Sequence, residues 1–260
     1  MPFILDKEQK SSLDRNGYSI IRDLLTASET EELQRWAQEM PYEEINSDGK
    51  RVLCRTENYA GSHAGLNALL RGEHLLSVLR ELAGEDMVLF KEKINYKLAG
   101  SGGFAAHIDS TAYVQVKQIK HLAILLAVDP SDLSNGGLEV VNGSHRLKVP
   151  IGADNCIEPS WIAQQTWTPV ELKAGEALIF GSSLAHRSAA NTSSQDRKAL
   201  YATYNVASDG DLHDEYYRRR RTEYPPTHLR KPGERFEAGA LRYGYGSPML
   251  SVDLGHQLAV

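Results

Sequence analysis

From about residue 87 to residue 206 the chain is a series of short β-forming runs separated by turns that contain glycine and proline. Short runs with frequent turn signals are typical of a two-sheet barrel or jelly roll. We therefore predict a mainly β fold flanked by helices. The predicted strands cover residues 87–98, 112–116, 121–128, 138–141, 168–172, 177–180 and 198–206.

Helical patterns precede this series. Ser28 and Glu31 have the spacing of a capping box and are followed by apolar residues at helical intervals, which predicts a helix over 28–40. The other elements expected here are helices over 7–15 and 66–82 and strands over 18–25 and 51–59.

A helical tail is predicted after the last strand. Asp211 is placed to cap a helix that continues through Arg218–Arg221 to Pro225 and Pro226. We interpret the four arginines as a solvated face balanced by nearby carboxylates, with anion binding as the alternative. Because no repeat or low-complexity linker interrupts the chain, we expect a single domain. Its parts are N-terminal helices over about 1–85, a barrel over about 86–210 and a helical tail over about 211–260.

The composition argues against several classes of protein. A net charge of −5 disfavours general binding to nucleic acid, which depends on clustered Lys and Arg side chains. Cys54 and Cys156 have no CxxC spacing, which fits a reducing compartment without a structural zinc site. No stretch resembles a signal peptide or a membrane span. We expect a cytoplasmic protein that binds neither nucleic acid nor membrane.

His107 and Asp109 are the strongest candidates for a metal site. In a strand, residues two apart point to the same face, so the imidazole and the carboxylate converge. His186, which follows the predicted strand over 177–180, is the best third ligand. Two histidines and one carboxylate form the three-ligand face of non-haem iron(II) oxygenases. The alternative is a hydrogen-bonded core histidine with a capping aspartate.

Three further residues suit a carboxylate ligand near that face. Arg197 stands eleven residues after His186, and a guanidinium binds a carboxylate through two parallel hydrogen bonds. Ser188 shares a strand face with His186, and Asn95 lies on the strand before His107. We expect all three to contact the same small molecule.

These residues, together with the turn over 135–145 and the Asn16-Gly17-Tyr18 opening, resemble the phytanoyl-CoA dioxygenase family of Fe(II)- and 2-oxoglutarate-dependent oxygenases from about residue 14 to 230. The resemblance implies a double-stranded β-helix, a jelly roll related to cupins. It implies that His107, Asp109 and His186 bind Fe(II), that Arg197 and Ser188 hold 2-oxoglutarate with help from Asn95, and that O2 is the oxidant. A carboxylate at 109 implies hydroxylation rather than halogenation. His121 and His145 are interpreted as structural.

The predicted substrate site is polar and rich in cations. It suits a small anionic or zwitterionic molecule. The residues expected at the mouth of the barrel are Lys93, Ser110 and Tyr113, with Arg55, Glu57 and Asn58 closing over it. The stretches 55–59 and 93–97 resemble those of bacterial family members that hydroxylate aminoalkylphosphonates, such as 2-aminoethylphosphonate, next to phosphorus. The alternatives are a hydroxylase of a compatible solute, an amino acid derivative or a natural-product intermediate, a non-catalytic metal-bound sensor, and a zinc hydrolase.

Overall fold

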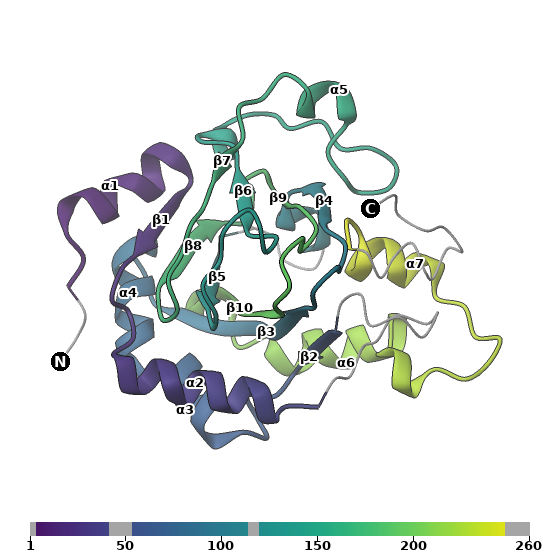
Figure 1. Cartoon of the computed structure of the whole chain (residues 1–260), viewed down its shortest axis with the longest axis horizontal. Coiled ribbons are helices and arrows are strands. Elements are labelled where there is room, and N and C mark those ends of the chain that lie inside the picture. Colours follow the sequence, from purple (N-terminus) through teal and green to yellow (C-terminus); the bar gives the residue numbers. More distant parts are fainter. Residues whose placement is uncertain (1–3, 42–53, 114–119, 248–260) are drawn as a thin grey trace.

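Two antiparallel sheets face each other in the computed structural model, which describes residues 4–41, 54–113 and 120–247 (Figure 1). The six-stranded sheet has the order β1-β8-β5-β10-β3-β2 and the four-stranded sheet the order β4-β9-β6-β7. The first sheet consists of β1 (Tyr18–Ile21), β8 (Ala177–Gly181), β5 (His121–Ala127), β10 (Arg197–Val206), β3 (Met87–Lys97) and β2 (Cys54–Glu57). The second consists of β4 (Phe104–His107), β9 (His186–Ser188), β6 (Leu138–Val140) and β7 (Thr168–Pro169).

Four helices cover the outer face of the six-stranded sheet (Figure 1). They are α1 (Lys7–Asn16), α2 (Ala27–Glu39), α3 (Ala64–Arg71) and α4 (Glu73–Ala83). Alternate residues of β10, such as Leu200 and Tyr204, face these helices, and Tyr204 donates a hydrogen bond to the carbonyl of Leu70 at 2.7 Å. The intervening residues face the other sheet, so the space between the sheets receives the opposite side of β10.

Helices of the tail lie beside the open end of the two sheets (Figure 1). They are α6 (His213–Glu223), α7 (Glu237–Gly239) and the π-helical turn η5 (Ala240–Gly244). The remaining short elements are η1 (Asp109–Ala112), η2 (Ser144–Arg146), α5 (Pro159–Ile162), η3 (Ala207–Asp209) and η4 (Thr227–Leu229). Among the described helices, none has the length and apolar character needed to cross a bilayer.

The N-terminal helices differ from their predicted limits. The helix predicted over 66–82 is two helices, because Gly72 is extended (φ −75°, ψ 147°) between α3 and α4. The cap of α2 is Thr26, which forms a capping box with Glu29, so the predicted Ser28–Glu31 pair lies inside the helix.

Several predicted strands are shorter than expected. β1 ends at Ile21, before Asp23 with its left-handed φ of 54°, and β7 keeps only the first two residues of 168–172. The strand predicted over 112–116 is wrong at its start, where η1 occupies Asp109–Ala112, and the stretch 114–119 lies outside the described residues. The predicted start of the 51–59 strand also lies outside them, and β2 begins at Cys54.

Candidate metal centre and active site

His107, Asp109 and His186 meet at the open end of the four-stranded sheet. His107 ends β4 and is paired in register with His186, the first residue of β9. Asp109 lies in η1 rather than in a strand, yet its Oδ1 is 3.9 Å from Nε2 of His107. One ligand atom from each of the three residues lies within 4.8 Å of the others. The grouping predicted for these three residues is therefore present, although the strand ends at His107, two residues before Asp109.

Backbone carbonyls fix the orientation of both imidazoles. Nδ1 of His107 lies 2.7 Å from the carbonyl oxygen of Ala105, and Nδ1 of His186 lies 2.9 Å from that of Leu184. A carbonyl only accepts, so each Nδ1 carries the proton and each Nε2 keeps its lone pair for a metal. Burial, helped by the neighbouring His186, lowers the pKa of His107 to about 3, which keeps the ring neutral.

The carboxylate of Asp109 is held in its charged form. Burial opposes ionisation, but His186, Lys91 and His107 outweigh it, and the pKa of Asp109 lies below its ordinary value. Two imidazoles and one carboxylate on a single face fit Fe(II) and leave the opposite positions of an octahedral ion open. The donor set therefore suits iron with a chelating co-substrate.

Two cavities meet at this triad. We call the first the barrel cavity, because it lies between the sheets and is lined by side chains such as Asn95, Phe180 and Ser188. We call the second the tail cavity, because α6 and the last described residues form its wall, with Arg220, Tyr243 and Tyr245 among the lining. Both cavities are also lined by Lys91, Lys93, Phe104, His107, Asp109, Tyr201 and Thr203. A ligand in either cavity reaches the metal face.

Two buried cations lie behind the barrel cavity. Nζ of Lys97 is 3.0 Å from Oγ of Ser188 and 3.0 Å from the carbonyl oxygen of Gly136. The guanidinium of Arg197, the register partner of Lys97, donates to the same carbonyl at 2.7 Å. Neither cation has a carboxylate within ion-pair distance in the described part of the chain. Arg197 and Ser188 therefore lie together, as the sequence predicts, and Lys97 is an addition.

Asn95 contacts another predicted residue. Its side chain lines the barrel cavity, and its Oδ1 accepts a hydrogen bond from Nε of Arg55 at 3.0 Å. Arg55 lines the tail cavity. Asn95 thus links the two cavities, whereas the sequence placed it only beside the co-substrate.

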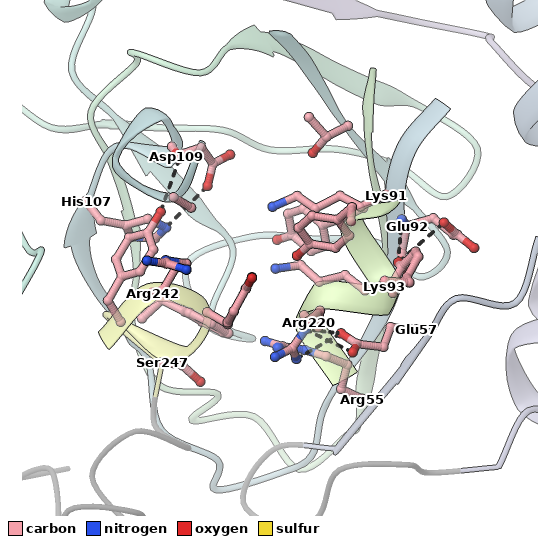
Figure 2. A pocket seen from close by; sticks show the side chains of 18 residues that line it. Arg55, Glu57, Lys91, Glu92, Lys93, His107, Asp109, Arg220, Arg242 and Ser247 are labelled. Carbon is pink, nitrogen blue, oxygen red and sulfur yellow. Dashed lines mark hydrogen bonds and ion pairs between the residues drawn. The ribbon is translucent and has the colours of Figure 1, made fainter. Parts of the chain in front are cut away.

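Lys91 and Lys93 project into the tail cavity opposite His107 and Asp109 (Figure 2). Among the described residues neither ammonium lies within ion-pair distance of a carboxylate, although Lys91 is 4.8 Å from the ring centre of Tyr113. Burial lowers the pKa of Lys91, and burial together with Arg55 lowers that of Lys93 well below its ordinary value. A bound anion would relieve both effects.

Arg220 is buried and does not belong to a solvated face. Its Nε lies 3.0 Å from Oε1 of Glu57, and both side chains line the tail cavity (Figure 2). Four consecutive residues spread around a helix, so one of them faces the interior. The prediction of a solvated face is therefore wrong for Arg220 and correct for the exposed Arg218 and Arg221.

The remaining predicted residues lie around the site but do not line the two cavities. The ring of Tyr113 stacks on His121 at 4.5 Å, and the Ser110 amide donates to the carbonyl of Ser182. Asn58 has a left-handed φ of 58°. His145 contacts the carbonyl of Asp14 at 3.0 Å, which joins η2 to α1 and agrees with a structural interpretation.

Several residues at or near the site were not predicted from the sequence. Lys91 and Lys97 continue the two-residue alternation of Lys93 and Asn95 along β3, and that alternation was a usable signal. No sequence pattern indicated that Arg242, Tyr243 and Tyr245 line the tail cavity, because their positions depend on how the tail folds back.

Comparisons with known proteins agree with this geometry. The family "Phytanoyl-CoA dioxygenase (PhyH)" matches residues 13–199. The chain is 34% identical to "2-aminoethylphosphonate dioxygenase" of Uncultured bacterium HF130_AEPn_1 over 94% of this chain and 98% of that one. It is 33% identical to "Methylphosphonate hydroxylase" of Gimesia maris, covering 92% and 96%, and 38% identical to "Dioxygenase lolE1" of Epichloe uncinata, covering 75% and 77%.

The fold agrees with a solved structure as well. The chain matches EctD from S. alaskensis, crystallised with 2-oxoglutarate and 5-hydroxyectoine, with a TM-score of 0.70 and 20% identity over 79% of this chain and 77% of that one. The predicted double-stranded β-helix is thereby confirmed. The chain belongs to the phytanoyl-CoA dioxygenase family of Fe(II)- and 2-oxoglutarate-dependent dioxygenases.

Proposed function

We propose that this dioxygenase hydroxylates a small organophosphonate at the carbon next to phosphorus, with 2-aminoethylphosphonate as the first candidate. The observation that carries the proposal is the pair of ammonium groups of Lys91 and Lys93, which face the triad without a carboxylate partner in the described residues. A phosphonate dianion supplies two negative charges and three acceptor oxygens in a compact group. Arg55, beside Lys93, adds a third cation on the same side.

In this proposal, separate groups of residues bind the iron, the 2-oxoglutarate and the substrate. His107, Asp109 and His186 hold the iron, which supplies the activation of dioxygen when bound. Ser188 and Arg197 bind the far carboxylate of 2-oxoglutarate, and Asn95 orients Arg55 toward the substrate. In the overall reaction one oxygen atom enters the C–H bond of the substrate and the other enters succinate, while 2-oxoglutarate loses carbon dioxide.

Two relatives support the choice of phosphonate. Both are named for phosphonate oxidation, and each aligns with more than nine-tenths of this chain. Lys91 and Lys93 on β3 give a physical reason to expect that this protein also binds a phosphonate.

The test is succinate release by anaerobically iron-loaded enzyme given O2, 2-oxoglutarate and a panel of phosphonates, betaines and amino acids. We expect one phosphonate to raise the rate strongly and to yield its 1-hydroxy derivative. Lys93→Met should remove most of that rise, whereas Lys198→Met, at a lysine paired with Asp129 at 3.0 Å, should not. A strong response to a betaine or an amino acid, with none to any phosphonate, would refute the substrate class.

The second candidate is hydroxylation of a small cationic or zwitterionic metabolite, such as a compatible solute. The observation in its favour is the set of tyrosine rings that line the tail cavity, since aromatic faces bind cations. "Ectoine dioxygenase" of Nocardia farcinica is 28% identical over 76% of this chain. The same panel separates the two candidates.

A further inference from the structure

The last described stretch, residues 236–247, forms one wall of the tail cavity. We call it the C-terminal strap. It contains α7, η5 and an irregular end, and Arg242 and Ser247 lie across the cavity from Lys91 and Lys93 (Figure 2). The family match ends at residue 199, so the strap lies beyond the matched residues.

Tyr245 of the strap contacts the segment that carries two metal ligands. Its hydroxyl oxygen lies 3.2 Å from the carbonyl oxygen of Ile108 and 3.3 Å from that of Asp109, so it donates to the backbone at the ligand itself. The edge of its ring meets the ring of His107 at 5.5 Å and 85°. One side chain therefore restrains both the imidazole and the turn that directs the carboxylate.

The next residue strengthens this connection. The carbonyl of Gly246 accepts a hydrogen bond from the amide of Ala105 at 2.8 Å. The carbonyl of Ala105 in turn accepts the Nδ1 proton of His107. Gly246 has a left-handed φ of 68°, which suits glycine, and a Cβ there would lie 3.3 Å from the carbonyl oxygen of Ala105. The strap thus supports the peptide that fixes the tautomer of His107.

The other end of the strap is tied to α6, away from the triad. Glu223 pairs with Arg242 and accepts a hydrogen bond from Tyr243 at 3.1 Å. Tyr243 therefore belongs to the same turn and the same cavity as Tyr245, but its hydroxyl bonds to α6 and not to the ligand segment.

We propose that the C-terminal strap completes the metal centre, with Tyr245 as a positioning residue for Asp109 and His107. Groups that orient metal ligands change metal affinity by roughly 10- to 100-fold when removed. The inference depends on the iron site and not on the identity of the substrate.

The test compares Tyr245→Phe with Tyr243→Phe in the full chain. Each variant loses one hydroxyl from the same wall, but only Tyr245→Phe loses the bonds to Ile108 and Asp109. We expect anaerobic calorimetry to show Fe(II) bound roughly 10-fold more weakly by Tyr245→Phe and with unchanged affinity by Tyr243→Phe. Equal affinity in Tyr245→Phe and the parent protein would overturn the proposal.

A second readout separates positioning from general stability. Each protein is compared with its own metal-free form, and the rise in unfolding temperature on adding Fe(II) should be smaller for Tyr245→Phe alone. A variant that is merely less stable would have a lower unfolding temperature in both forms, but the rise on adding Fe(II) would be unchanged. Neither measurement uses a phosphonate, so failure of the proposed substrate leaves this test intact.

Discussion

Lys97 is a buried cation whose partners are neutral oxygen atoms. Only 1% of its surface is exposed, and it contacts Ser188 and the carbonyls of Gly136 and Ala189. Burial, with a contribution from Arg197, lowers its pKa to about 7. A carboxylate bound beside Ser188 would stabilise the ammonium form. We therefore expect the charge on Lys97 to contribute to binding of the co-substrate.

Because Lys97 titrates near pH 7, we expect the affinity for 2-oxoglutarate to depend on pH. The ammonium form binds the carboxylate and is lost as the pH rises through about 7, so the dissociation constant should rise above that pH, by at most roughly tenfold per pH unit. Lys97→Met should bind more weakly and show a flat profile. Anaerobic calorimetry with Mn(II)-loaded protein between pH 6 and 9 measures this. A flat profile in the parent protein would contradict it, and Lys198→Met is the matched control.

The triad was predictable from sequence for a physical reason. A separation of two residues keeps His107 and Asp109 together whether the chain stays extended or enters a tight turn, as it does here. Arg220 and Tyr245 were not predictable, because each acts on a residue more than a hundred positions away. Their partners follow from the packing of the tail and not from any local pattern.

Among the elements, the turn that contains Gly136 holds the two buried cations of the proposed co-substrate site. Its carbonyl accepts hydrogen bonds from both Lys97 and Arg197. Gly136 has φ of 73°, and a Cβ there would lie 2.5 Å from Nζ of Lys97 and 2.7 Å from the carbonyl oxygen of Ala189. No side chain fits without moving these groups.

Gly136→Ala should therefore reduce stability and 2-oxoglutarate affinity together. The left-handed backbone alone costs about 1–2 kcal/mol for a residue with a Cβ. Chemical denaturation and calorimetry check the two effects. Gly181→Ala is the control, because nothing lies within 4 Å of a Cβ at that position. Unchanged affinity in Gly136→Ala would show that the turn does not set the position of the two cations.

The helix α6 is held to β3 by a pair that titrates. Nε2 of His213 lies 2.8 Å from Oε2 of Glu92, and both side chains are buried. Burial lowers the pKa of His213, but the bonds to Glu92 and Asp214 outweigh it and raise the pKa above its ordinary value. A raised pKa in the folded protein means stability that is complete below the unfolded value, about 6.5, and is lost as pH rises through the folded value.

The free energy of unfolding should accordingly fall more between pH 6 and 9 for the parent protein than for His213→Gln, which cannot titrate. Urea denaturation at several pH values measures the difference, and titrating groups that do not contact His213 cancel in the comparison. Parallel pH profiles would rule out this contribution of His213. Element limits were harder to predict than element types, since Gly72 divides one apolar helical pattern and η1 occupies the first residue of the strand predicted over 112–116.

Across the whole molecule, the proposed co-substrate site draws residues from both sheets. His107 and His186 lie on the four-stranded sheet, whereas Lys97 and Arg197 lie on the six-stranded sheet. A 2-oxo acid bound to the metal at one end and to Arg197 at the other connects the sheets. Without metal, only the contacts with Arg197 and Ser188 would remain.

Stabilisation by 2-oxoglutarate should therefore require metal. At a hundred times its dissociation constant a ligand adds about 2.7 kcal/mol, which is on the order of 5 °C for a chain of this length. Anaerobic thermal unfolding of Mn(II)-loaded protein should show this rise, and metal-free protein should show little. Arg197→Met should keep the rise caused by metal and lose most of that caused by 2-oxoglutarate. An equal rise in metal-free protein would mean that the acid binds without the metal, and the proposal that metal and Arg197 hold it together would have to be abandoned.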